Sequence, residues 1–336
     1  FQRYINYDIT SKENKDELEE RYLAFLIKDN NVFKYDIGLA RNIDKKIKSA
    51  LKSTEQGLKD SEQKWGEVRN LIIKPMIKEF NNKDILFISP DGLLNNIPFS
   101  SLPRKVLMQT RYFGEEYDIR LISTARDLIK LYGSKQQKSK PSLVVANPTF
   151  QFNNNDKEIN LLSEIKASKN QTRNISKQNK SWKSLPYSEI EGEEISKIIN
   201  AKLIKGKNAK ADSIKSISNP KILHIASHFS TLQEKSTLDN FMNPLLNSSI
   251  ALAGASNLIK EGNNNGYLTA LEISQMNLDS TELVVVSGCD TALGEIYLSE
   301  GNFGLKRALT LAGARSSLLS LWKVDDKITS EFMISF

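Results

Sequence analysis

Two short apolar runs decide the predicted fold: KILHIASH at residues 221–228 and ELVVVSGCD at residues 282–290. Both are rich in Val, Ile and Leu, and both end in small or polar residues that stop a strand. Three further runs share this texture, namely DILFISPDG at 84–92, SLVVANP at 142–148 and ARSSLLSLW at 314–322. Helical patterns at 190–199 and 303–312 lie between the later runs. Because strands that are apolar on both faces and alternate with helices form covered parallel sheets, we predict a three-layer α/β domain with a mostly parallel central sheet.

The first 80 residues have a different texture, because their apolar residues recur at helical spacing. This spacing is seen in Leu23, Leu26 and Ile27, in Ile43, Ile47 and Leu51, and in Val68, Leu71 and Ile72. We therefore predict a few helices between about Leu18 and Phe80, with Pro75 kinking or restarting the last one. Residues 1–83 are expected to form a helical connector, and residues 84–336 the α/β domain. The chain begins without Met and stops inside an amphipathic pattern, so we expect it to be a piece of a longer protein.

Residues 151–184 interrupt the α/β pattern with a stretch rich in Asn, Lys, Gln and Ser. Its few large apolar side chains cannot bury enough surface to offset the entropy lost on ordering. We therefore predict an exposed, flexible insertion here. A shorter polar stretch at 260–266 is expected to be a loop tip.

The composition excludes several classes of protein. The chain of 336 residues contains one Cys and two His, with 47 Lys and Arg against 40 Asp and Glu. One Cys cannot form an internal disulfide, and three Cys and His side chains cannot complete a four-ligand zinc site without carboxylates. This cysteine usage favours a reducing compartment, so we expect a cytoplasmic protein. The net charge of +7 is spread along the chain among acidic residues, which favours a lysine-rich solvated surface over a nucleic-acid site. No apolar run approaches the roughly 20 residues that span a bilayer.

Two of the five predicted strands end in side chains that can perform nucleophilic catalysis. His228 closes the run at 221–228, and Cys289 closes the run at 282–290. Ligands of open α/β sheets bind at the carboxyl ends of strands, and a thiol beside a histidine readily becomes a thiolate nucleophile. The bare residues also allow a simpler interpretation. A lone Cys at a strand end is usually a small buried hydrophobe, and the mid-strand His224 is expected to be a packed core histidine.

Attack by such a thiol on a carbonyl also needs hydrogen-bond donors for an oxyanion. The backbone N–H groups of Cys289 and of Phe229, which follows His228, are the candidates. Gly301 and Gly304 at a predicted helix start offer a different possibility, a site for an anion or a nucleotide. A single GxxG without a Lys is a weak signal, so a nucleotide-binding domain is the less favoured interpretation.

Several blocks of the sequence resemble the CHAT domain family, and they occur in the right order. They are DILFISPDGLLNNIPFSSLP (84–103), IRLISTARDLIKL (119–131), LPYSEIEGEEISKII (185–199), KILHIASH (221–228), NPLLNSSIALAG (243–254), GYLTALEISQMNLDSTELVVVSGCDTALG (266–294) and SEGNFGLKRALTLAGARSSLLSLWKVDD (299–326). The family comprises caspase-like cysteine peptidases that are usually found behind tetratricopeptide repeats in bacterial proteins. The resemblance implies a caspase-hemoglobinase fold from about residue 84 onward, preceded by the end of a helical repeat region.

The family pattern implies roles for individual residues. The second His of its HxxxH motif is the general base, which here is His228, and the Cys of SxCxT is the nucleophile, which here is Cys289. His224 keeps a structural role. The residue after the base is often Gly in the family, whereas this chain has Phe229, so the loop that presents an oxyanion donor departs from the pattern.

The resemblance also implies where a substrate binds. Caspase-like folds hold the substrate as an extended strand, here beside the run at 317–322. Relatives that cut after Lys or Arg often carry an acid two residues before the nucleophile. This chain has a serine there, so basic specificity is not implied unless nearby aspartates supply the charge. The residues expected to contact substrate are Ser287, Asp290, Ser320, Trp322 and Asp325.

The sequence thus predicts a cysteine endopeptidase that cleaves a protein partner through His228 and Cys289 and that needs no metal or organic cofactor. The family context implies control by a regulatory partner through N-terminal repeats, in bacterial defence or signalling. A catalytically silent caspase-like scaffold for protein–protein interaction is the alternative. Neither nucleic acid nor a membrane is expected as a partner.

Overall fold

The computed structural model describes residues 1–6, 19–82, 84–133, 138–152, 182–231, 244–246, 248–256, 266–288, 295–297, 301–320 and 325–336. These residues form two compact units, one of Phe1–Tyr132 with Ile296–Asn302 and one of Gly133–Glu295 with Phe303–Phe336. Each unit has its own buried apolar core. Within the described part of the chain, no helix has the length and apolar character needed to cross a membrane.

The described residues up to Tyr132 in the first unit form three small sheets and two longer helices. Its elements are β1 (Gln2–Asn6), β2 (Glu19–Lys28), β3 (Asn31–Leu39), α1 (Ala40–Glu55), α2 (Ser61–Ile72), η1 (Lys74–Glu79), β4 (Ile85–Ile88), η2 (Gly92–Asn96), η3 (Phe99–Ser101), β5 (Pro103–Val106), β6 (Gln109–Tyr112), α3 (Phe113–Glu116), β7 (Asp118–Leu121) and α4 (Arg126–Gly133). Strands β1, β2 and β3 form an antiparallel sheet, β4 and β7 pair in parallel, and β5 and β6 pair antiparallel.

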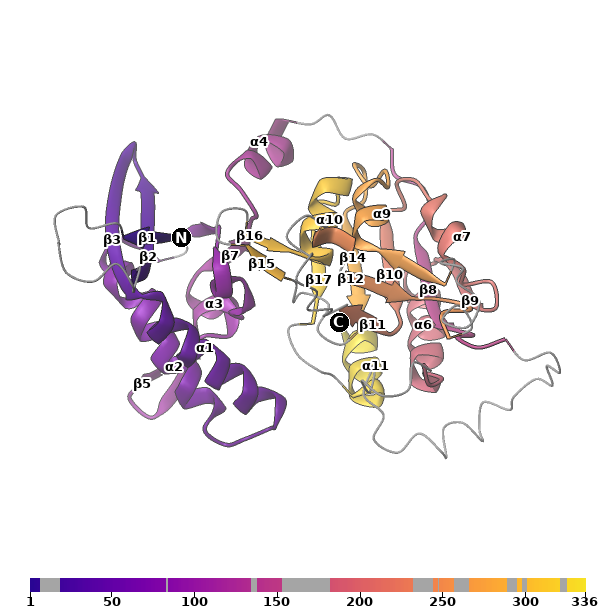
Figure 1. Ribbon diagram of the computed structural model, residues 1–336, viewed down its shortest axis with the longest axis horizontal. Helices are drawn as coiled ribbons and strands as arrows, with labels where there is room; N and C mark the ends of the chain where they lie inside the picture. Colours follow the sequence, from indigo (N-terminus) through magenta and orange to yellow (C-terminus); the bar gives the residue numbers. More distant parts are fainter. Residues whose placement is uncertain are drawn as a thin grey trace. The chain divides into compact units, whose positions relative to one another are not determined.

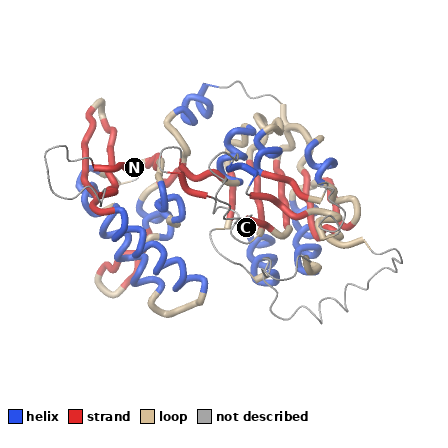
Figure 2. Tube along the Cα trace, viewed as in Figure 1, coloured by secondary structure: helices blue, strands red, loops and turns tan. Residues whose placement is uncertain are grey.

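The helical prediction is wrong for residues 19–39, which form the β2–β3 hairpin (Figure 2). Three apolar residues of β2 fit a helical spacing, but the turn decides the structure. Strand β2 ends at Lys28 and β3 begins at Asn31, so Asp29 and Asn30 form a two-residue loop, with φ of 49° and 62°. Positive φ at both loop positions is typical of the type I′ turn, whose twist matches that of a hairpin. Asp and Asn adopt this conformation more readily than most residues.

The helical prediction is confirmed for α1 and α2. Ile43 and Ile47 of α1 and Val68 and Ile72 of α2 are buried, as their spacing requires. Helix α2 ends at Ile72, and the chain restarts as the 3-10 helix η1 with Pro75 in its first turn. A proline is tolerated there because the N–H that it lacks has no partner inside the helix.

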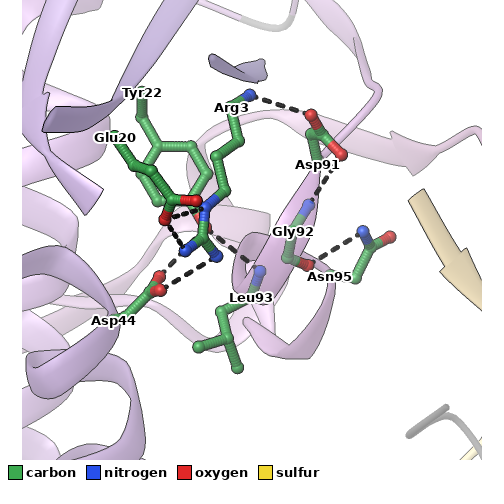
Figure 3. A network of polar contacts seen from close by, with 8 residues as sticks. All are labelled: Arg3, Glu20, Tyr22, Asp44, Asp91, Gly92, Leu93 and Asn95. Atoms are coloured by element: carbon green, nitrogen blue, oxygen red, sulfur yellow. Dashed lines mark hydrogen bonds and ion pairs between the residues drawn. The ribbon is translucent and has the colours of Figure 1, made fainter. Parts of the chain in front are cut away.

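A network of polar contacts joins the β-sheet of the first unit to α1 and η2 (Figure 3). The Arg3 guanidinium forms an ion pair with Glu20, and its Nη1 lies 3.1 Å from Oδ2 of Asp44. The Tyr22 hydroxyl donates to Oδ1 of Asp44 at 2.9 Å and accepts from the backbone N–H of Leu93 at 3.1 Å. Burial raises the pKa of the Asp44 carboxyl and of the Tyr22 phenol. The network satisfies buried polar groups and so has a structural role.

The predicted boundary at residue 83/84 falls inside the first unit, between η1 and β4. Of the predicted insertion at 151–184, residues 153–181 lie outside the described residues. Most of the predicted loop tip at 260–266 lies outside them as well.

The second unit is built on a five-stranded parallel sheet with the order β17-β14-β10-β8-β9 (Figure 1). Its elements are β8 (Leu143–Pro148), α6 (Pro186–Ile198), β9 (Lys202–Gly206), α7 (Ala211–Lys215), β10 (Ile222–Ala226), β11 (Phe229–Thr231), η5 (Pro244–Leu246), β12 (Ser248–Ala251), β13 (Tyr267–Thr269), α9 (Ala270–Ser274), β14 (Leu283–Ser287), α10 (Leu305–Ala312), β17 (Ser317–Leu319) and α11 (Asp326–Ser335). Strands β11, β12 and β13 form a separate antiparallel sheet. Strands β15 (Glu295–Tyr297) and β16 (Gly301–Phe303) pair with each other, and all their residues except Glu295 and Phe303 belong to the first unit.

The predicted parallel sheet is confirmed, since four of the five predicted strands are β8, β10, β14 and β17. The fifth, β4, pairs with β7 in the first unit. The predicted helices at 190–199 and 303–312 correspond to α6 and α10. Strand β9 was not predicted from the sequence. Its KLIKG run sits at the edge of the sheet and is half polar, so it lacks the apolar signature of a central strand.

Helix α6 packs closely on β8, because Gly192 faces the sheet. A Cβ at Gly192 would collide with the Cβ of Ala146 and would lie 3.2 Å from Leu203 Cδ1. Val144 and Ala146 of β8 face this helix, whereas the alternate residues Leu143 and Val145 belong to the main apolar core with residues of α9 and α10. The two sets of side chains alternate along the strand, as the pleat requires.

Candidate active site

Strands β10 and β14 end side by side at one edge of the parallel sheet. They are neighbours in the sheet, and their last residues, Ala226 and Ser287, are paired. Beyond them the backbone N–H of Ser227 donates to the carbonyl oxygen of Ser287 at 3.3 Å. His228 follows the end of β10, and Gly288 follows the end of β14.

Some of the predicted site residues around this edge lie outside the described residues, and others lie within them. Cys289, Asp290 and Trp322 lie outside the described residues. Ser287 is fully buried at the end of β14, and the hydroxyl of Ser320, just after β17, donates to the carbonyl oxygen of Gly288.

Asp325 has a structural partner at the start of α11. Its carboxylate accepts hydrogen bonds from the backbone N–H groups of Lys327 and Ile328, both at 3.0 Å, and so caps the helix. The neighbouring Asp326 is buried and accepts from the backbone N–H of Tyr187 in α6 at 3.1 Å. Both aspartates are thus engaged in holding α11.

His228 is buried, with only 3% of its surface exposed. Its Nε2 lies 2.8 Å from the carbonyl oxygen of Lys183. Its ring stacks on Trp182, with 4.7 Å between ring centroids and 25° between planes, and contacts Phe150 with a centroid distance of 5.0 Å. A carbonyl oxygen can only accept, so Nε2 carries a proton and donates it. In the neutral ring, Nδ1 is then the basic nitrogen.

Trp182 is itself fixed at both its backbone and its ring. Its backbone N–H donates to the Ser256 hydroxyl at 2.9 Å, and its indole Nε1–H donates to the Tyr267 hydroxyl at 3.0 Å. Burial raises the pKa of the Tyr267 phenol, which keeps the phenol neutral at ordinary pH. Trp182 and Phe150 belong to one small buried cluster with Leu185. These contacts fix the position of the Trp182 ring that stacks on His228.

The backbone N–H of Phe229 points out of the β11–β12 ladder. Phe229 pairs with Ile250, and the N–H of Ala251 donates to the carbonyl oxygen of His228 at 2.9 Å. In an antiparallel ladder this pattern makes Phe229 and Ile250 a pair without mutual hydrogen bonds, so the Phe229 N–H is directed away from β12. Phe229 lies in strand β11 and has an extended backbone conformation that any residue can adopt. Its side chain is buried in the core. The departure from the family's usual Gly therefore does not strain the backbone.

His224 faces the opposite direction from the core residues of β10 and meets α6. Its Nε2 lies 2.8 Å from Oε1 of Glu191, and both side chains are almost completely buried, with exposures of 3% and 0%. This contact is in keeping with the structural role predicted for His224. It also links the middle of β10 to the middle of α6.

The residues that hold the two histidines were not predicted from the sequence. Trp182 lies within the predicted exposed insertion, and the structure corrects this, because Trp182 is buried against His228. The only signal was an isolated Trp in an otherwise polar stretch, directly before the SLP that precedes α6. Glu191 was hidden among the acidic residues of α6 and had no feature that marked it as buried.

The chain was also compared with known proteins. A sequence model described as the CHAT domain matches residues 65–336, which is most of the chain. No curated protein matches the chain.

Proposed function

Because this chain belongs to the CHAT domain family, a caspase-like family, we propose that it is a cysteine endopeptidase with His228 as general base and Cys289 as nucleophile. One observation carries the proposal. His228 is buried, oriented by the Lys183 carbonyl, and lies where β10 ends beside β14, whose chain continues directly to Cys289. The expected three-layer caspase-like arrangement belongs to the same proposal.

In the proposed reaction, Nδ1 of His228 takes the proton of the Cys289 thiol. The sulfur then attacks the scissile carbonyl carbon, and the carbonyl electron pair moves to the oxygen. Collapse of this intermediate breaks the C–N bond while the His228 imidazolium gives its proton to the leaving amine, which leaves a thioester. A water molecule that loses a proton to His228 attacks the thioester and releases the acid and the thiol.

The backbone N–H groups of Phe229 and Cys289 are proposed to stabilise the oxyanion. Support comes from the orientation of the Phe229 N–H away from β12. Removing one such donor typically costs about 10²- to 10³-fold in rate, so this contribution is large even without a charged side chain.

A peptide substrate is proposed to add as a strand beside β17, the outer strand of the parallel sheet among the described residues. The full burial of Ser287 and the capping role of Asp325 argue against direct substrate contact by these two side chains. Asp290, Ser320 and Trp322 remain the residues proposed to contact substrate. Control by a regulatory partner through N-terminal repeats also stays a proposal.

The single cysteine makes a direct test of the dyad possible, because any thiol modification is at Cys289. At pH 6 we expect iodoacetamide to alkylate the wild-type thiol at least about 10-fold faster than the thiol of His228→Asn, since only the thiolate reacts. Mass spectrometry of intact protein follows the reaction. As a matched control, His224→Asn, in the strand that ends two residues before His228, should alkylate at nearly the wild-type rate. Equal rates for the wild type and His228→Asn would contradict the proposed dyad.

The ring that stacks on His228 provides a second test. Trp182→Ala is expected to lower kcat by about 10- to 100-fold, because a base displaced by about 1 Å loses much of its catalytic advantage. Trp182→Phe keeps a stacking surface and should retain most of the activity, although it loses the hydrogen bond to Tyr267. The pH–rate profile should shift in Trp182→Ala, whereas a purely structural role would lower stability and leave the profile unchanged.

A further inference from the structure

A groove with a volume of about 870 Å³ lies on the second unit, between the start of the parallel sheet and the segment around α7. Its walls come from residues 140–143 before and within β8, residues 202–205 of β9, and the stretch from Asn208 to Pro220. The groove is thus at the amino ends of β8 and β10, whereas His228 follows the carboxyl end of β10. This volume is within the range of known ligand sites.

The groove is positively charged. Its fifteen lining residues include four lysines and no Asp or Glu, so the local charge differs from the mixed charge of the sequence as a whole. Hydrogen bonds to Glu189 and Glu193 raise the pKa of Lys205. These two carboxylates form ion pairs with Lys205 and so neutralise its charge. The other three lysines, Lys140, Lys202 and Lys210, are exposed and have no carboxylate partner among the described residues.

Strand β9 also offers unused backbone groups. The N–H of Lys202 donates to Ser142, and the carbonyl of Gly206 accepts from Thr149, so the even-numbered residues of β9 bond to β8. In a parallel ladder the alternate residues then direct their N–H and C=O away from β8. These residues are Leu203 and Lys205. The C=O of Lys205 accepts from the N–H of Asn208 at 3.3 Å, so the groups left for another strand are the N–H and C=O of Leu203 and the N–H of Lys205. Strand β9 is the outer strand of the sheet in the described part of the chain (Figure 1). Such an edge can accept a further strand.

We propose that this groove, called the lysine groove below, binds an acidic segment of a partner protein as an extended strand beside β9. An extended peptide supplies backbone donors and acceptors for the β9 edge, and its carboxylates pair with the three lysines of the groove that have no carboxylate partner among the described residues. Five residues of β9 span about 16 Å, so a segment of similar length covers the edge. The site works independently of the proposed dyad, and its binding is measured without any cleavage step.

The test uses fluorescence anisotropy with a labelled eight-residue peptide that alternates Glu with Val and Thr, on the full chain in 50 mM NaCl. Binding is expected, and a peptide with Gln in place of Glu should bind at least 10-fold more weakly. The triple variant Lys140→Glu/Lys202→Glu/Lys210→Glu should weaken binding of the acidic peptide by about 10- to 100-fold, at roughly 2- to 5-fold for each lost surface pair. Raising the salt to 500 mM should weaken it as well.

A matched control separates the lysine groove from the overall charge. Lys34→Glu/Lys45→Glu/Lys59→Glu changes the net charge equally on exposed lysines of the first unit and should alter binding less than about 3-fold. Equal weakening by both triple variants would overturn the proposal, as would the absence of binding to the acidic peptide. An oligothymidylate that binds as tightly as the peptide, and loses binding in the groove variant, would assign the groove to nucleic acid instead.

The backbone part of the proposal has its own test. N-methylation of alternate residues of the peptide removes the N–H groups from one of its edges and keeps every carboxylate. Two peptides are compared, one methylated at its odd-numbered residues and one at its even-numbered residues. One of the two should bind at least about 5-fold more weakly than the other, because only one edge of the peptide faces β9. If both methylated peptides bind with the affinity of the parent peptide, no strand is added, and the proposal is overturned.

Discussion

Replacement of His228 by Asn should lower kcat/KM for peptide-bond cleavage by about 10³-fold, an effect expected to be equalled only by the loss of Cys289. The reason is that the proposed reaction uses the ring twice, as a base for the thiol and as an acid for the leaving amine. The asparagine side chain would retain a polar group near the Lys183 carbonyl, but it has no nitrogen that exchanges a proton near neutral pH. The rate of appearance of new N-termini in a cell extract, followed by mass spectrometry, measures the effect.

His224→Asn is the matched control, because it removes an imidazole from β10, four residues before His228. It should lower the melting temperature, since it disturbs the contact with Glu191, and it should leave the rate at lower temperature within about 10-fold of wild type. Cys289→Ala should be as inactive as His228→Asn, and the double variant no worse than either, because the two residues act as one unit. Cleavage by His228→Asn within 10-fold of the wild-type rate would rule out the assignment.

The sequence predicted the centre of the second unit well, because its strands carry a strong signal. Strands β8, β10 and β14 are buried on both faces. Short runs of Val, Ile, Leu and Ala are typical of such central parallel strands. The ends of such strands meet at one edge of the sheet, so His228 could be placed there from the sequence alone. Strand β9 carried no such signal, since an edge strand needs only a half-apolar pattern.

The sequence failed where a few residues outweigh the periodicity. In β2, apolar residues three and four positions apart suggested a helix, but Asp29 and Asn30 adopt the two positive φ values that close a hairpin. At the site, the contacts of His228 with Trp182 and of His224 with Glu191 join residues far apart in the chain. Such contacts depend on how distant segments pack in three dimensions, so the periodicity of the sequence does not predict them.

Removal of Glu191 should cause the largest loss of stability. Glu191→Ala is expected to lower the free energy of unfolding of the second unit by about 3 kcal/mol, because it leaves the buried His224 without the carboxylate that it contacts at 2.8 Å. For a unit of about 200 residues this corresponds to a fall in melting temperature of about 6–12 °C, measured by calorimetry. Glu194→Ala on the exposed side of the same helix is the control and should cost less than about 1 kcal/mol.

Two further variants show whether the loss comes from the contact itself. Glu191→Gln keeps an oxygen that accepts from Nε2 of His224 and should recover part of the stability. The double variant Glu191→Ala/His224→Ala should be at least about 1 kcal/mol more stable than the sum of the two single losses predicts, because each single change leaves a buried polar group behind. Strict additivity would mean that the two side chains contribute separately through packing. Coupling would show that this pair joins β10 to α6 four residues before His228. The strand that leads to the proposed base would then be held in place by a contact that takes no part in the chemistry.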